Sequence, residues 1–261
     1  MIEKLNVLDK GFVRVVDKMG SDEAIVQSAR ISYGSGTKKT SQDRGLIRYL
    51  MRHMHTSPFE MCEIKFHIKL PIFVARQWVR HRTANVNEYS ARYSIVEDEF
   101  YIPSIENISL QSVDNKQGRG QIVSKEEAEE IRELLIKQSD EAYKAYQHML
   151  EKGIARELAR VVLPQNVYTQ MYWKIDLHNL LHFIKLRSHS TAQFEIREFS
   201  KALEKIVEEW LPITYEAFVD YKLESVNVSR VLRPYLKRQG VLAEELGITE
   251  EKEFEEFWPL A

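Results

Sequence analysis

The strongest secondary-structure signal in the chain is the alternating run Cys62-Glu63-Ile64-Lys65-Phe66-His67-Ile68-Lys69-Leu70. Apolar side chains occupy every second position of this run, and successive side chains of a β-strand point to opposite faces. The run therefore predicts a strand with one buried face and one polar face. A second alternating run, from Val167 to Ile175, predicts another strand.

Helical patterns surround these two strands. Apolar spacing and capping residues predict helices over 21–30, 41–53, 71–80, 124–153, 154–162, 176–186, 191–210 and 212–223. Residues 103–123 are polar, contain glycine and are predicted to form a loop with its tip at 114–118. Because the strands and helices do not alternate regularly, we expect an α+β fold in which a mixed sheet is flanked by long helices. We expect one domain over 1–223 and a charged C-terminal extension over 224–261, packed on the domain or trailing it.

Composition limits the class of protein. The 261 residues are 44% hydrophobic and 29% charged, an ordinary globular mixture that can bury a core. No apolar run approaches the ~20 residues that span a bilayer, and the first residues lack a signal-peptide pattern. We therefore expect a cytoplasmic protein without a membrane partner. The net charge of −2 argues against a nucleic-acid partner, and the single cysteine, Cys62, excludes an internal disulfide and a cysteine-rich metal site.

The densest group of chemically functional side chains lies between Gln77 and Arg92, in the segment QWVRHRTANVNEYSAR. Arginine side chains bind phosphates with two parallel hydrogen bonds. Asparagine, glutamine and serine side chains can read the polar edges of a heterocycle. The segment therefore favours an anionic planar ligand such as a nucleotide. A solvated basic loop with local ion pairs is the alternative that composition alone leaves open.

The same segment resembles the signature of the flavin-dependent thymidylate synthases, the ThyX family. The resemblance rests on Arg80-His81-Arg82, seven further residues and then Ser90. It is supported by His55-Thr56-Ser57-Pro58-Phe59-Glu60 upstream, and by Ala159-Arg160-Val161-Val162-Leu163-Pro164 and Leu186-Arg187-Ser188 downstream. It covers roughly residues 8–221.

The resemblance implies a homotetramer whose active sites are shared between subunits. It implies methylation of dUMP to dTMP with FAD as cofactor, methylenetetrahydrofolate as carbon donor and NADPH as reductant. The flavin would be bound without a Rossmann fold, because Gly34-Ser35-Gly36 lacks the third glycine of that fingerprint. Most aromatic residues at such positions belong to the core, so we assign no stacking residue. The candidates are Trp78, Tyr93, Tyr101, Trp173 and Phe194, and Trp78 leads them because it directly precedes the arginine-rich run.

The resemblance also assigns roles to individual residues. It implies dUMP contacts from Gln77, Trp78, Val79, Arg80, Glu88, Tyr89, Ser90, Ala91, Arg92, Arg160 and Arg187. It implies FAD contacts from His55, Ser57, Arg80, His81, Arg82, Glu88, Asp176, His178 and His182. Arg187 is the predicted catalytic residue, because a fixed cation beside the uracil would stabilise negative charge developing on the ring.

Two nucleophile hypotheses need weighing. Ser90 has no histidine or lysine placed in sequence as its base, so we favour a ligand-binding role for its hydroxyl. Cys62 lies on the apolar face of a predicted strand, so we expect a buried, inert thiol.

Two other classes of function compete with the synthase. His178 and His182 share a helix face and lie near His189, which resembles the ligand set of a metal-dependent nucleotide hydrolase. The set lacks a glutamate between the histidines and a cysteine ligand, so we expect no metal. An RNA-binding module built on the arginine-rich segment is disfavoured by the acidic balance of the chain.

Overall fold

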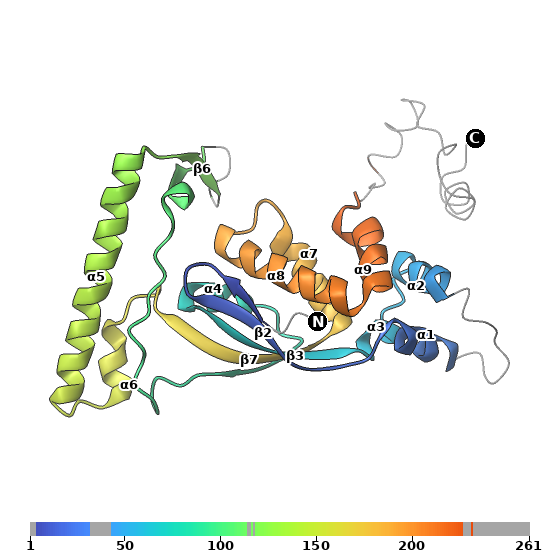
Figure 1. Ribbon diagram of the computed structural model, residues 1–261, viewed down its shortest axis with the longest axis horizontal. Helices are drawn as coiled ribbons and strands as arrows, with labels where there is room; N and C mark the ends of the chain where they lie inside the picture. The colour runs from blue at the N-terminus through green and yellow to red at the C-terminus, as the bar shows by residue number, and fades with distance from the viewer. Residues whose placement is uncertain (1–3, 32–42, 114–115, 117, 227–230, 232–261) are drawn as a thin grey trace. The chain divides into compact units, whose positions relative to one another are not determined.

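The computed structural model describes residues 4–31, 43–113, 116, 118–226 and 231 (Figure 1). The helices and strands named below all belong to the compact unit that ends at Leu223. Gly34-Ser35-Gly36, the predicted helix start at residue 41, most of the tip at 114–118 and nearly all of 224–261 lie outside the described residues. The expected C-terminal extension therefore stays a prediction.

A five-stranded sheet forms the centre of this unit. The strands follow the order β1 (Lys4–Val7), β2 (Gly11–Met19), β3 (Glu63–Pro71), β7 (Tyr168–Asp176) and β4 (Asn85–Glu88), and each neighbouring pair is antiparallel. The two strands predicted from alternation are β3 and β7, and they lie side by side with Phe66 opposite Trp173. The predicted α+β class is confirmed.

Helices cover the apolar face of the sheet. Helices α4 (Ile72–Trp78), α7 (Leu177–Ser188) and α8 (Phe194–Trp210) contact its strands and lie on one side of it (Figure 1). The buried side chains between these layers include Phe66, Trp173, Trp78, Phe183 and Phe199. Burial of so many large apolar groups is the main force that holds α7 and α8 on the sheet.

The remaining helices are α1 (Asp22–Arg30), α2 (Asp43–Arg52), α3 (Ser57–Glu60), α5 (Lys125–Glu151), α6 (Arg156–Ala159), a 3-10 turn (Arg160–Val162), α9 (Pro212–Phe218) and a π-helical turn (Val219–Leu223). The predicted capping box at the start of α5 is present, with Ser124 and Glu127 bonded reciprocally. Within the described residues, no helix combines the length and the apolar character needed to cross a membrane.

The buried carboxylate of Asp22 joins helix α1 to helix α9. Asp22 begins α1, yet its oxygens accept hydrogen bonds from Ile213 N (3.1 Å), Thr214 N (3.0 Å) and Thr214 Oγ1 (2.6 Å) at the start of α9. A carboxylate at a helix N-terminus satisfies free N–H groups and opposes the positive end of the helix dipole. Asp22 therefore caps a helix far away in the sequence.

The structure corrects four sequence predictions. Residues 103–123 are not a plain loop, because they hold a 3-10 turn (Ile105–Asn107) and a hairpin of β5 (Ser109–Gln111) and β6 (Arg119–Ile122). The strands β1, β2 and β4 were not predicted. The helix predicted over 154–162 is reduced to α6 and a 3-10 turn. The helix predicted over 71–80 ends at Trp78, and the helix predicted over 191–210 begins at Phe194.

Candidate active site

Arg187 lies in the last turn of α7, where its side chain reaches back to the end of α4. Its Nε donates a hydrogen bond to His81 Nε2 (3.0 Å), and its Nη2 donates one to the backbone oxygen of Gln77 (3.3 Å). The guanidinium is half-buried, and burial lowers the pKa of Arg187. Helix α7 is fixed at its other end by Asp176, whose carboxylate accepts from Asn179 N at 3.0 Å. Three residues predicted for the site, Gln77, His81 and Arg187, are therefore in direct contact.

His81 acts as a hydrogen-bond acceptor in this arrangement. Its ring packs against Phe183, with 4.6 Å between ring centroids, and lies 6.1 Å from the ring of His182. Burial, followed by the positive charge of Arg187 and by His182, lowers the pKa of His81 to about 4. His81 is thus neutral near pH 7, and because Nε2 accepts from Arg187, we assign the ring proton to Nδ1.

Two further cations flank His81. Arg80 and Arg82 are exposed, and neither guanidinium forms a hydrogen bond or ion pair with another residue in the part of the chain that the structure describes. Arginine side chains without protein partners next to a half-buried cation provide hydrogen-bond donors for phosphate oxygens. The predicted phosphate-binding role of the arginine-rich segment therefore fits the geometry.

The second half of the segment runs along β4 and the turn after it. Glu88 accepts a hydrogen bond from Thr169 Oγ1 (2.8 Å), and Tyr89 N donates to Gln170 O (2.8 Å). Ser90 Oγ accepts from the backbone N–H of Arg92 at 3.4 Å. No described histidine or lysine is bonded to the Ser90 hydroxyl, which agrees with a binding role for this group.

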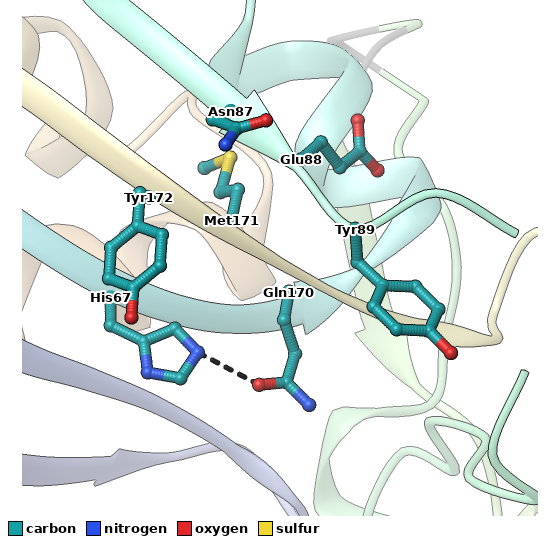
Figure 2. A pocket seen from close by; sticks show the side chains of 7 residues that line it. All are labelled: His67, Asn87, Glu88, Tyr89, Gln170, Met171 and Tyr172. Atoms are coloured by element: carbon teal, nitrogen blue, oxygen red, sulfur yellow. Dashed lines mark hydrogen bonds between the residues drawn. The ribbon is translucent and has the colours of Figure 1, made fainter. Parts of the chain in front are cut away.

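A shallow hollow of about 230 Å³ lies beside Glu88 and Tyr89 (Figure 2). It is also lined by His67, Asn87, Gln170, Met171 and Tyr172, and His67 Nε2 lies 2.8 Å from Gln170 Oε1 within it. Ligand pockets usually enclose ~300–1,000 Å³. The hollow is smaller than that, and it includes only two of the residues predicted for the site.

Arg92 and Arg160 lie at and directly after α6. Arg92 pairs with Glu157 of α6 at 3.1 Å, and the neighbouring Arg156 donates to Tyr93 O at 2.8 Å. Arg160 is exposed on the 3-10 turn after α6. Among the described residues, no hydrogen bond or ion pair joins these cations to Arg187.

The residues predicted for FAD occupy several elements. His55 and Ser57 are exposed beside the start of α3, with the His55 ring 5.8 Å from that of Tyr49. His178 and His182 lie on α7, one turn apart. Over the described ranges, no three or more histidine, cysteine, aspartate or glutamate side chains are grouped as metal ligands, so the hydrolase hypothesis gains no geometric support.

Trp78 and Cys62 are both core residues. The Trp78 side chain is fully buried, with its ring 4.5 Å from Phe183 and 5.1 Å from Trp173. Its indole ring cannot stack on flavin or folate in this arrangement, and only its backbone is left for the predicted dUMP contact. Cys62 is also fully buried, and burial raises the pKa of its thiol to about 11, as expected of an inert thiol.

Two side chains that received no role in the sequence analysis touch the site. Gln77 Nε2 donates a hydrogen bond to Gln193 Oε1, and Gln193 Nε2 donates to Glu195 Oε2 at 2.8 Å. The available signal is Glu195, a glutamate on a buried face of α8 that is otherwise apolar apart from Ser200.

The chain is similar to proteins of a known family. The family model described as thymidylate synthase complementing protein, Thy1, matches residues 14–213. The chain is 59% identical over 246 residues to the flavin-dependent thymidylate synthase of Ehrlichia ruminantium (strain Gardel), covering 93% of this chain and 83% of that protein. It is 57% identical over 252 residues to the enzyme of that name from Wolbachia pipientis wMel, covering 95% and 89%.

A solved structure is also similar. The UMP/dUMP methylase PolB from Streptomyces cacaoi, bound with 5-Br dUMP, matches with a TM-score of 0.76 and 33% sequence identity. The match covers 84% of this chain and 99% of that chain.

Proposed function

The chain belongs to the family of thymidylate synthase complementing proteins, and from this membership we propose that it is a flavin-dependent thymidylate synthase that methylates dUMP to dTMP. The structural observation that carries the proposal is the contact of Arg187 with His81 and Gln77 beside the exposed cations Arg80 and Arg82. This arrangement suits a ligand that has a planar polar ring and a phosphate.

Arg187 is the proposed catalytic residue. Carbon 5 of uracil becomes nucleophilic only when negative charge develops on the ring, and a fixed cation beside the ring stabilises that charge. Arg187 is held by two hydrogen bonds, and because neutral His81 accepts one of them, no positive charge of the imidazole opposes the guanidinium. Half-burial strengthens the interaction between this cation and a charged ring.

The proposed cofactor is FAD, with NADPH as reductant and methylenetetrahydrofolate as carbon donor. When bound, the flavin supplies hydride to the reaction. The residues present fit a flavin with its phosphates, since Arg80 and Arg82 offer exposed donors and His178 and His182 offer a polar helix face. His55, Ser57, Glu88 and Asp176 complete the predicted set.

We propose that the enzyme works as a homotetramer with shared active sites. The support is the membership of the chain in this family. The cytoplasmic location stays a prediction.

An absorption experiment tests the function. The ultraviolet-visible spectrum of the purified protein should show flavin bands that NADPH bleaches anaerobically, and bleaching should be faster when dUMP is present. Added methylenetetrahydrofolate should then yield dTMP. A protein that binds no FAD after reconstitution, or whose reduction is indifferent to dUMP and which makes no dTMP, would refute the proposal.

A further inference from the structure

A buried carboxylate is linked by hydrogen bonds, through Gln193, to the proposed substrate residue Gln77. Glu195, in the first turn of α8, is 2% exposed. Its Oε1 accepts hydrogen bonds from Tyr101 OH (3.1 Å) and from Arg119 Nη2, and its Oε2 accepts one from Gln193 Nε2 (2.8 Å). A buried charge with this many donors around it is held in one orientation.

The carboxylate fixes the direction of two amide groups in succession. Because Glu195 can only accept, Gln193 must turn its NH₂ group toward it, and the oxygen of Gln193 then faces Gln77. That oxygen in turn requires the NH₂ group of Gln77. The amide of Gln77 is therefore held in one of its two flip states, with its oxygen and its second amide hydrogen left for a ligand.

We propose that Glu195 and Gln193 are positioning residues for dUMP binding, and that they act by fixing the amide of Gln77. The inference rests on the proposed function, in which Gln77 contacts dUMP. A glutamine that can flip would offer donor and acceptor at exchanged positions, and the mismatch with the nucleotide would weaken binding.

The hairpin of β5 and β6 belongs to the same network. Arg119 on β6 donates to Glu195 and to Asn107 O (2.9 Å), and its guanidinium lies 5.3 Å from the centre of the Phe194 ring. Arg119 thus neutralises the buried carboxylate that orients Gln193. This ion pair connects the 103–123 segment to Gln77 through the side chains of Glu195 and Gln193.

The test exchanges the two polar groups. Glu195→Gln and Gln193→Glu each disturb the order of donors and acceptors, whereas the double variant Gln193→Glu/Glu195→Gln restores it. In the double variant, the carboxylate at position 193 accepts from Gln77, and the amide at position 195 donates to it while its oxygen accepts from Tyr101 and Arg119. The matched control is Glu198→Gln on the same helix, where the carboxylate bonds only Lys201 among described residues (2.6 Å).

The measurements are the dissociation constant and KM for dUMP, kcat, FAD content and the melting temperature. We expect each single variant to raise the dUMP dissociation constant and KM about tenfold, the value of one hydrogen bond, with kcat and FAD content close to wild type. The double variant should return to within about threefold of wild type, as a coupled pair does. Glu198→Gln should leave every value unchanged.

Two results would overturn the inference: single variants with wild-type KM, or a double variant no better than the singles. If either single variant fails to fold, Gln193→Met removes the bridging amide and keeps the buried ion pair of Glu195, and an unchanged KM in that variant also overturns it. A wild-type protein that binds neither dUMP nor FAD would instead refute the proposed function, so the two failures are distinguishable.

Discussion

Acidification should destabilise the protein through His81. Burial and Arg187 lower the pKa of His81 from 6.5 to about 4 in the folded state. The unfolded chain binds this proton near pH 6.5, so between these values it carries more protons than the folded chain, and stability must fall as the pH falls. At 1.36 kcal/mol per pKa unit the limit is about 3 kcal/mol, and solvent screening of the half-buried ring reduces it to roughly 1–2 kcal/mol.

The assay compares wild type with His81→Gln. The glutamine oxygen can accept the hydrogen bond from Arg187 without binding a proton, so the variant should lose about 1–2 kcal/mol less than wild type between pH 7.5 and pH 4.5. Reversible urea unfolding at several pH values gives the difference. His148→Gln, at an exposed position on α5, is the control and should follow wild type. Parallel pH profiles for wild type and His81→Gln would refute the reasoning.

Four other substitutions have defined outcomes. Arg187→Ala should keep the fold and the flavin but lower turnover by ~10²–10³; wild-type rates would contradict the catalytic role. Ser90→Ala should retain measurable turnover with weaker dUMP binding, and complete loss of turnover with intact dUMP binding would favour a nucleophile. Cys62→Ser should leave turnover per folded, flavin-loaded protein unchanged, because the thiol is fully buried and its pKa is raised to about 11. Asp22→Ala should lower the free energy of unfolding by about 2–4 kcal/mol, since it leaves the buried donors of Thr214 and the half-buried N–H of Ile213 unpaired; a loss below about 0.5 kcal/mol would show that water replaces the cap.

The fold could be predicted where one face of an element is buried. The alternation of β3 and β7 was clear because every second residue enters the core. Alternation in β2 is interrupted by a register shift between Val15 and Asp17, which hid the strand. The side chains of β4 are all exposed, so its pairing with β7 leaves no apolar pattern to detect.

The site could be predicted only in part. The arginine-rich segment was found because its cations are adjacent in sequence. The contact between Arg187 and His81 joins residues 106 positions apart, and periodicity carries no information about such a contact. Trp78 is a related case, since it directly precedes the arginine-rich run in sequence while its ring packs on Phe183 and Trp173. Gln193 shows no such pattern, because only the folded chain brings it against Gln77, 116 positions away.

The position of β4 at the edge of the sheet has a consequence for hydrogen exchange. No described strand lies beyond β4, so an opening that releases it from β7 leaves the other four strands paired. The amides of Asn85–Glu88 should therefore exchange through a small local fluctuation, well below the free energy of global unfolding. A nucleotide that binds only the closed form must slow this exchange in proportion to its occupancy. Ligand affinity and the order of this edge are thus two measures of one equilibrium.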